Sequence, residues 1–255
     1  MKDKIGGIVR ALVGVPKERL VVVQRVVNRL NVAAEHGDEF QMRLSEFVLG
    51  WRPEEAQLDF STIPESFHLS AKLYTKLFGK VPDFGSVEVP EIPSDGHEYL
   101  VGFAPKELIN WTNGSPKEGL FQSRKKLFPT WKYTNESLDV AISMDNDQRD
   151  LRKGSYVFLM RDSETPDEDL MNLSANQIAE MNIMTSTDTE YALFSGLFFL
   201  KHGYHPDRQT WTINAGSRSR RGSVPGGYWF GDGSRVGWYD QSYRGPDLGS
   251  RRVWF

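Results

Sequence analysis

Apolar residues recur at helical spacing through the first 80 residues of the chain. Every third or fourth position is apolar after Pro16, again over residues 38–49, and again over residues 64–78. This is the period of a helix that buries one face, and Gly79 stands where a glycine commonly ends a helix. We therefore predict a small helical N-terminal region over residues 1–80. Its simplest role is packing, and an oligomerisation or docking module is the alternative.

The pattern changes after this helical region. Residues 81–97 contain three prolines and no helical period, which indicates a linker or an extended crossing segment. Short apolar runs bounded by turn residues then predict strands over 99–103, 137–144 and 155–160. Between them we expect turn-rich segments such as 111–119.

Two helices with clear start signals follow these strands. Ser174 stands three positions before Gln177, and Thr187 stands three before Glu190, which is the spacing of a capping box. The second helix carries the ten-residue apolar run 191–200, and we expect the second domain to pack around it. That run is too short to cross a bilayer, and the chain has no apolar run of about 18 residues, so we expect no membrane span.

The last 54 residues differ from the rest in composition. They contain no Lys, Glu or Met, whereas residues 1–201 contain 13, 17 and 7 of these, and they carry 10 Gly, 8 Arg, 4 Tyr and 4 Trp instead. Disordered segments lack the aromatic surface that offsets the entropy of ordering, so we predict that this tail is folded and loop-rich. Candidate strands lie at 210–213, 227–230, 235–239 and 251–255, with a hairpin turn indicated by GDGS at 231–234.

Charge and cysteine content exclude several classes of function. The 255-residue chain has a net charge of −3, and its tail holds 8 Arg against 4 Asp, a net charge of +4. The absence of Cys excludes disulfides and thiolate catalysis. The apolar N-terminal stretch is interrupted by Arg10 and Pro16, and no small-residue cleavage site follows it. We therefore predict a cytoplasmic or virion-associated protein rather than a secreted one.

A set of tail residues carries a resemblance to a known family. In chain order they are TWT at 210–212, VP at 224–225, Trp229, Val236, Trp238, and LG at 248–249 followed by Arg251. With the order of strand, strand, two helices and a Trp-rich C-terminal half, they resemble the variable proteins of diversity-generating retroelements, which have a C-type lectin-like fold. The resemblance implies an α+β chain in which the helical region and the linker precede a C-type lectin-like domain over 98–255. Residues 1–97 carry no resemblance of this kind.

The resemblance also implies a hypervariable region near the C-terminus, which we place at 214–247. In that family the codons are diversified at adenines, typically in asparagine-type triplets, which cannot become Lys, Glu, Gln, Met or Trp. The absence of Lys, Glu and Met from the tail agrees with this. The implied function is non-enzymatic: massive sequence variation on a fixed scaffold displays a recognition surface for unidentified protein ligands. No cofactor and no metal are implied, and homo-oligomer formation is left open.

Residue types suited to recognition are interspersed through the tail. Tyrosine buries much area at low entropic cost while Ser, Gly and Asn adapt, which is the mixture that antibody loops use, and arginine offers planar, bidentate donors. We predict that ligand is bound by Asn214, Ser217, Arg218, Ser219, Arg220, Arg221, Ser223, Tyr228, Phe230, Asp232, Tyr239, Asp240, Ser242, Tyr243 and Asp247. For the three tyrosines, half-buried packing is the alternative. Large apolar anchors belong beneath such loops, so we assign to the scaffold Trp211, Trp229, Trp238, Trp254, Val224, Pro225, Leu248 and Gly249.

Catalytic functions are the first alternative. Formylglycine-generating enzymes share the lectin-like fold, but the catalytic Cys that this resemblance implies is absent. His202 and His205 lie three residues apart near Asp207, which is a weak metal-binding pattern, because a helix end followed by a turn produces the same spacing. The three aspartates within residues 145–150 are more simply a solvated turn than paired catalytic carboxylates.

Two further binding functions are less well supported. Calcium-dependent sugar binding would require closely spaced carboxylate and amide oxygens in the tail, and no Glu follows Glu190. The Arg, Tyr and Trp of the tail suit single-stranded nucleic acid. However, a net charge of +4 is modest and the rest of the chain is acidic, so we do not expect nucleic acid to be the main ligand.

Overall fold

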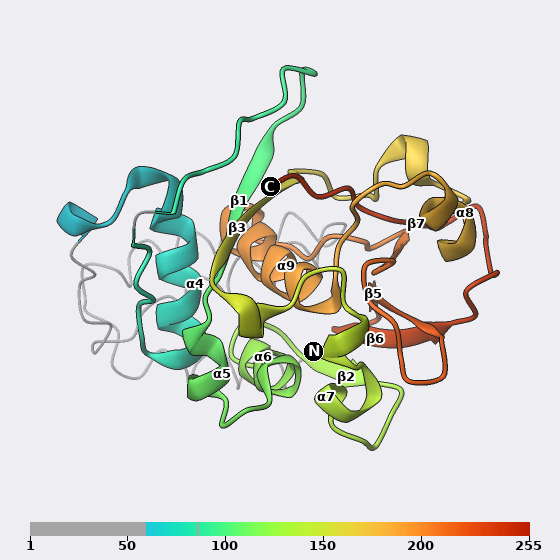
Figure 1. The fold of residues 1–255 in the computed structure, drawn as a ribbon, viewed down its shortest axis with the longest axis horizontal. Helices are drawn as coiled ribbons and strands as arrows, with labels where there is room; N and C mark the ends of the chain where they lie inside the picture. Colours follow the sequence, from blue (N-terminus) through green and yellow to red (C-terminus); the bar gives the residue numbers. More distant parts are fainter. Residues whose placement is uncertain (1–59, 86) are drawn as a thin grey trace, which may run out of the picture. The chain divides into compact units, whose positions relative to one another are not determined.

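The computed structural model describes residues 60–85 and 87–255 (Figure 1). These described residues belong to one compact unit. The helices predicted after Pro16 and over 38–49 lie outside the described residues. Among the described helices, none is long and apolar enough to cross a membrane.

The unit is a mixed α+β structure with two separate sheets. The smaller sheet pairs β1 (Tyr99–Ala104) with β3 (Tyr156–Arg161) in antiparallel register, which confirms two of the predicted strands. The larger sheet has the strand order β2-β6-β5-β4-β7. In it, β2 runs parallel to β6 and β4 parallel to β7, and the other pairs are antiparallel. Its strands are β2 (Thr130–Lys132), β4 (Trp211–Ile213), β5 (Val224–Phe230), β6 (Gly233–Tyr239) and β7 (Leu248–Gly249).

Helix α9 (Asp188–His202) lies between the two sheets in Figure 1 and contacts both β1 and β5. The predicted capping box is confirmed, because the Thr187 and Glu190 side chains each accept the other's backbone N–H, and Gly203 ends the helix at φ +79°. Eleven of its 15 residues are buried. A helix covered on most sides has little need of a polar face, which confirms the prediction that the domain packs around 191–200.

The helix predicted over 64–78 is also confirmed. It consists of a 3-10 turn, η2 (Glu65–Phe67), continued by α4 (His68–Phe78). Gly79 ends α4 at φ +66°, a conformation that glycine adopts readily because it lacks a Cβ atom. A second 3-10 turn, η1 (Phe60–Thr62), precedes this segment.

Helix α4 belongs to the same compact unit as the strands that follow it. It packs against α9 and β1, and the Tyr74 hydroxyl donates to the Phe103 carbonyl oxygen across 2.5 Å. Phe84, in the segment between α4 and β1, is buried beside Phe67 and Phe103 at ring-centroid distances of 4.8 and 5.0 Å. This segment is therefore a packed crossing connection. The boundaries predicted at 80 and 98 fall inside this one compact unit.

The strand predicted over 137–144 is wrong. Helix α7 (Leu138–Ala141) takes its place, and the Ser137 hydroxyl accepts a backbone N–H of its first turn, the capping position that serine favours. Leu138 and Ile142 are both buried. Because they are four positions apart, they lie on one side of a helical turn, so a short apolar run of this kind fits a helix as well as a strand.

Several short helices occupy the remaining connections. Two of them lie in or beside the segment 111–119 that was predicted to be turn-rich, and the second begins with Pro116 in the first turn, where proline costs least. The capping box predicted at Ser174 is confirmed at the start of α8. These elements are α5 (Glu107–Trp111), α6 (Pro116–Arg124), η3 (Met144–Asn146), η4 (Leu151–Lys153), η5 (Glu168–Leu170) and α8 (Ala175–Glu180).

Three of the four strands predicted in the tail are confirmed as β4, β5 and β6. Gly231 and Asp232 form the two-residue turn of the β5–β6 hairpin, and Gly231 has φ +63°, as such turns require. Residues 251–255 do not form the fourth strand. Trp254 makes only an isolated bridge, to Leu159 of β3.

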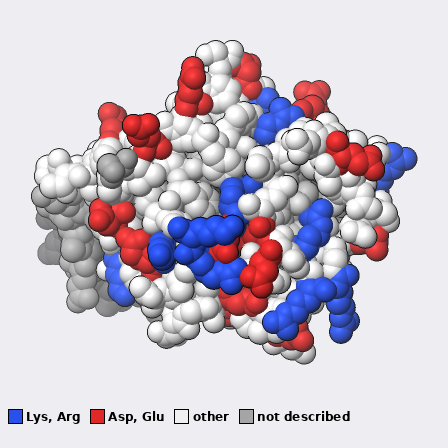
Figure 2. Space-filling view, viewed as in Figure 1, with Lys and Arg blue, Asp and Glu red and all other residues white. Residues whose placement is uncertain are grey.

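Charged side chains of both signs are mixed over the molecular face drawn in Figure 2. Several of the surface charges are paired, such as Arg208 with Glu164 at 2.9 Å and Arg252 with Asp169 at 2.7 Å. Surface ion pairs contribute little to stability. The fold therefore depends mainly on its core.

Candidate ligand-binding surface

The larger sheet turns one face toward α9 and the other away from it. Gly227 of β5 lies on the α9 side, where a Cβ atom would stand 2.0 Å from the Tyr191 ring. Successive residues of a strand point to opposite faces, so Tyr228 lies on the outer side. Residues opposite one another in adjacent strands share a face. Arg235 of β6 and Trp131 of β2 therefore lie on the same outer face as Tyr228.

Six aromatic side chains form a continuous row on this outer face, which we call the aromatic strip. The rings of Trp131 and Tyr133 are 3.9 Å apart between centroids, and the Tyr228 hydroxyl donates to the Tyr133 hydroxyl across 3.2 Å. Trp211 lies 5.2 Å from Tyr228 and 6.1 Å from Tyr239, which in turn lies 6.0 Å from the last member. In order, the strip consists of Trp131, Tyr133, Tyr228, Trp211, Tyr239 and Tyr243.

The aromatic strip is open to solvent. The exposed fraction is 44% for Trp131, 53% for Tyr133 and 37% for Trp211. Tyr228 and Tyr239 are half-buried within the row. A contiguous exposed patch of large apolar side chains usually marks an interaction site in a soluble protein. The strip is therefore the strongest candidate for a ligand-binding surface.

Two glycines form the floor beneath the tyrosines of the strip. Gly226 of β5 lies opposite Gly237 of β6. A Cβ atom at Gly226 would stand 2.6 Å from the Tyr239 ring and 2.8 Å from the Thr212 carbonyl oxygen, whereas one at Gly237 would make ordinary contacts of 3.6 Å or more. Gly226 therefore allows the Tyr239 ring to lie directly against the backbone of the sheet.

Hydroxyl and guanidinium groups add polarity to the strip. Burial, together with the neighbouring Tyr133 hydroxyl, raises the pKa of Tyr228 to about 12, and burial also raises the pKa of Tyr239. Both hydroxyls are therefore protonated at neutral pH. The Arg235 guanidinium lies 5.6 Å from the Trp131 ring centroid and 3.5 Å from a carboxylate oxygen in the β5–β6 turn. A ligand would meet apolar rings, hydroxyl donors and one cation.

Most of the residues predicted to bind ligand lie at the surface or near it. Three are buried, which corrects the prediction for them: Asn214, Ser217 and Ser219 are 1%, 0% and 9% exposed. Four are half-buried: Arg218, Ser223, Tyr228 and Tyr239. Eight are exposed: Arg220, Arg221, Phe230, Asp232, Asp240, Ser242, Tyr243 and Asp247.

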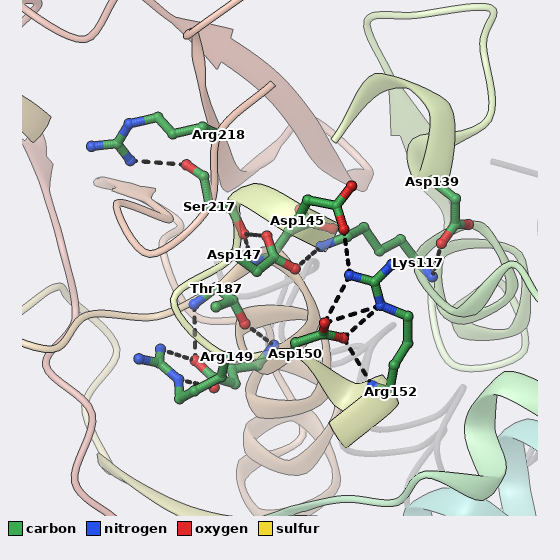
Figure 3. A network of polar contacts seen from close by, with 12 residues as sticks. Lys117, Asp139, Asp145, Asp147, Arg149, Asp150, Arg152, Thr187, Ser217 and Arg218 are labelled. Atoms are coloured by element: carbon green, nitrogen blue, oxygen red, sulfur yellow. Dashed lines mark hydrogen bonds and ion pairs between the residues drawn. The ribbon is translucent and has the colours of Figure 1, made fainter. Parts of the chain in front are cut away.

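The Ser217 hydroxyl joins three parts of the unit (Figure 3). It accepts the backbone N–H of Asp188, the first residue of α9, across 2.9 Å and donates to Asp147 across 2.6 Å. The other oxygen of this carboxylate lies 2.5 Å from the ammonium group of Lys117 on α6, and these two side chains are 4% and 0% exposed. Burial raises the pKa of Asp147 to about 6, although the Lys117 charge and the Ser217 hydroxyl act in the opposite direction. The loop after β4 is thereby fixed to α6 and α9.

The three aspartates within residues 145–150 therefore differ in role. Asp145 is a solvated turn residue, as predicted: its side chain is 75% exposed and pairs with Arg152 at 2.5 Å. Asp150 caps η4 and pairs with the same arginine at 2.7 Å. The prediction is wrong for Asp147, whose buried side chain points toward Lys117 (Figure 3), because a buried ammonium group requires a buried counter-ion.

Asn214 and Ser219 also bond within the protein. The Ser186 hydroxyl donates to the Asn214 side-chain oxygen across 3.2 Å, and the Ser219 hydroxyl accepts the Arg221 backbone N–H across 3.2 Å. The Arg218 guanidinium folds back onto two backbone carbonyl oxygens of its own loop at 2.6 and 2.9 Å. Burial lowers the pKa of this guanidinium. The start of the predicted hypervariable region is therefore part of the scaffold.

A buried ion pair holds the last residues of the chain against β4. Arg251 and Asp207 are 3.0 Å apart, and neither side chain is more than 1% exposed. Asp207 also accepts the hydroxyls of Tyr191 and Thr212, at 2.8 and 2.9 Å. Breaking such a pair would leave an uncompensated buried charge. Arg251, which the sequence singles out only through the resemblance, is thus an anchor of the C-terminal segment.

The three-residue spacing of His202 and His205 does not bring them to one site. His202 Nε2 lies 2.7 Å from Asp162, whereas His205 is buried beside the rings of Phe128 and Trp229 at 5.0 and 5.2 Å. Burial lowers the pKa of His205 to about 3, so it is neutral. Within residues 60–85 and 87–255, no group of three or more His, Cys, Asp or Glu is placed to hold a metal ion.

The tail tryptophans are less buried than predicted. Trp211 is 37% exposed, because β4 turns the next residue, Thr212, inward toward the buried ion pair. Leu and Phe side chains around α9 fill the core instead. The other three, which are half-buried, are Trp229, Trp238 and Trp254. The remaining predicted scaffold residues are buried, as expected: Val224, Pro225, Leu248 and Gly249.

The sequence does not single out Trp131 or Tyr133 as binding residues. They precede the tail by many residues. Two aromatic residues at alternate positions within 130–133 are too short a pattern to predict a strand. The parallel pairing of β2 with β6 brings both rings to the strip. Such pairing joins distant segments, so no local pattern reveals it.

Comparison of the chain with protein-family models, curated proteins and solved structures finds no match. The chemistry of the strip and the resemblance in the tail are therefore the grounds for a functional proposal.

Proposed function

We propose that this chain is a non-enzymatic binding protein that recognises protein ligands through the aromatic strip. The observation that carries the proposal is the continuous row of six aromatic rings on the outer face of a five-stranded sheet. Trp and Tyr contribute most to binding energy at protein interfaces. Held on a sheet, they lose little further entropy when a ligand binds.

The residues around the strip fall into an accessible set and a fixed set, as display of a variable surface requires. Asp232, Asp240 and Ser242 lie exposed in turns at the ends of the strands, where substitutions usually change stability little. Beneath them, the contacts of Ser217 and Arg251 hold the loops to the core. This separation favours recognition that changes by substitution while the fold stays constant.

We further propose that the domain is of the C-type lectin-like kind and is a variable protein of a diversity-generating retroelement. The order β1, β3, α8, α9 and then β4 to β7 agrees with the element order behind the resemblance, with α5, α6, β2 and α7 inserted between β1 and β3. Val224, Leu248 and Arg251, three residues of the resemblance, are buried, as scaffold positions should be. The diversified residues would then be the exposed ones downstream of Ser219.

The DNA downstream of the gene tests the diversification. We expect a near-copy of the 3′ end of the coding sequence, beside a reverse transcriptase gene, that differs from it at adenines. The absence of a repeat, or differences spread evenly over all four bases, would refute this part of the proposal. The aromatic strip would remain a candidate binding surface in either case.

Titration with single-stranded DNA separates the proposal from the nucleic-acid alternative. We expect no quenching of Trp fluorescence by oligo(dT) at physiological salt. Binding that falls steeply as salt rises would favour nucleic acid, because release of counterions from phosphates is its signature.

A further inference from the structure

We propose that the segment bound by the aromatic strip is an extended, proline-rich peptide in the polyproline II conformation. This inference rests on the proposed function, because it names the kind of protein segment that the recognition surface accepts. Four features support the inference: the inclination of the rings, the hydroxyl donors, the pairing of the backbone beneath the rings, and the local charge.

Three neighbouring pairs of rings in the strip are inclined to one another, whereas Tyr239 and Tyr243 are stacked at 23°. The interplanar angle is 85° between Trp131 and Tyr133, 41° between Trp211 and Tyr228, and 38° between Trp211 and Tyr239. Inclined rings present edges as well as faces and do not form one flat platform. A flat platform suits bases or sugars that stack in succession, whereas aromatic rings set at angles suit the pyrrolidine rings of a polyproline II helix.

The width of the strip fits a short linear segment. The strip crosses the sheet from β2 to β4, which is three steps between neighbouring strands. Strands lie about 4.8 Å apart, so this crossing spans roughly 14 Å. A polyproline II helix rises about 3.1 Å per residue, and about five residues would cover that width.

The polar groups of the strip match a ligand that is rich in acceptors. A polyproline II helix has no internal hydrogen bonds, so its carbonyl oxygens are available to a partner, and proline has no N–H that would need an acceptor. Tyr228 donates to Tyr133, which leaves the Tyr133 proton for a ligand. Tyr243, at the other end of the strip, is 48% exposed. Hydroxyl donors at both ends therefore complement the carbonyl oxygens.

Pairing by strand addition, the other common mode for an extended peptide, is disfavoured on this face. Gly226 and Gly237 lie at the centre of the strip, in β5 and β6. Both strands have a neighbouring strand on each side. Their backbone N–H and C=O groups are used within the sheet, so a ligand must be held by side chains.

The charge beside the strip argues against nucleic acid and for a basic peptide. Between residues 226 and 249 the chain carries three Asp and two Arg, and the Asp232 side chain is 91% exposed. Proteins that bind single strands need a positively charged groove along the phosphates. The exposed Asp232 near Arg235 at one end of the strip instead favours prolines flanked by Lys or Arg.

Selection from a phage-displayed library of random dodecapeptides on the full chain tests this inference. We expect the selected peptides to be enriched in proline, with Lys or Arg nearby, and to bind W211A about tenfold more weakly or worse, since aromatic anchors dominate binding. Y133F, which removes only a hydroxyl, should weaken binding several-fold. F255A removes an exposed ring outside the strip and should bind as the wild type does. Thermal unfolding of each variant verifies that it is folded.

Each outcome of the selection has a defined meaning. Peptides that depend on Trp211 but are not enriched in proline would overturn this inference and leave the proposed recognition surface intact. Peptides that bind W211A as tightly as the wild type would contradict the proposed function as well. Failure to select any peptide would also overturn the inference, while the DNA test of diversification would be unaffected.

Discussion

Two serines of the tail show how much the surroundings of a single hydroxyl matter. Ser217 is buried between a carboxylate and the N-terminus of α9. Ser242 is exposed and donates to Asp240 across 2.5 Å. Small polar side chains serve equally well in binding loops and as internal partners of the backbone. For this reason both serines were predicted from the sequence to bind ligand, and only the fold shows that their roles differ.

Replacing Ser217 by alanine is expected to lower the free energy of unfolding by about 1–3 kcal/mol, because two buried groups each lose a hydrogen-bond partner. S242A is the matched control and should stay within about 0.5 kcal/mol of the wild type. Urea unfolding measures both changes. Equal losses in the two variants would contradict the role assigned to Ser217.

His205 makes stability depend on pH in a defined direction. Its pKa falls from 6.5 to about 3 in the folded protein, so the unfolded chain binds a proton below pH 6.5 that the folded chain does not. The contribution of His205 to the free energy of unfolding is therefore complete above pH 6.5. It is lost as the pH falls toward 3, by at most about 1.4 kcal/mol per pH unit.

Comparison of the wild type with H205Q isolates this contribution. The difference between their unfolding free energies should shrink as the pH is lowered from 7 to 5, as measured by urea unfolding at each pH. H97Q, which removes an exposed histidine, controls for the substitution itself. A difference for H205Q that stays constant over this range would show that the pKa of His205 is not lowered in the folded protein.

At the scale of elements, the signals that predicted structure correctly were local. A capping box acts within four residues, so Ser174 and Thr187 mark the starts of α8 and α9 in the sequence itself. The apolar run at 137–144 was ambiguous, because a short run fits a helix or a strand. The aromatic strip depends on pairing of β2 with β6, and pairing across such a separation leaves no local trace.

The glycines beneath the strip provide a test at this scale. G226A is expected to lower the free energy of unfolding by about 1–3 kcal/mol, because a Cβ atom 2.8 Å from the Thr212 carbonyl oxygen forces the backbone to shift. G237A has ordinary contacts at 3.6 Å and beyond and should stay within about 1 kcal/mol of the wild type. Chemical denaturation measures both, and a larger loss in G237A would mean that the floor of the strip is arranged differently.

At the scale of the whole molecule, buried charges hold the tail to the core from two directions. The Lys117–Asp147 pair fixes the loop after β4, and the Arg251–Asp207 pair fixes the last residues of the chain. Both pairs join segments that are distant in sequence, which is why charge patterning along the chain predicted neither. The exposed turns between them carry the side chains that remain free to change.

Simultaneous replacement of five exposed residues tests this division between surface and scaffold. A surface substitution usually changes the free energy of unfolding by no more than about 0.5 kcal/mol. The variant with alanine at all five positions should therefore lose less than about 2.5 kcal/mol of unfolding free energy, as measured by urea unfolding. The control with alanine at the three buried positions Asn214, Ser217 and Ser219 should lose more. The reverse order would contradict the division. The five exposed positions are Arg220, Asp232, Asp240, Ser242 and Asp247.

The burial of Asn214 has a consequence for the gene. Both asparagine codons contain two adenines, so no synonymous choice can protect this position from a process that alters adenines. Under the proposed diversification, the altered stretch should therefore begin downstream of codon 214. Ser217 and Ser219, also buried, can be protected in place by the serine codons TCT, TCC or TCG, which lack adenine. The nucleotide sequence should show that choice at these two positions, while the exposed Ser242 is free to use AGC or AGT.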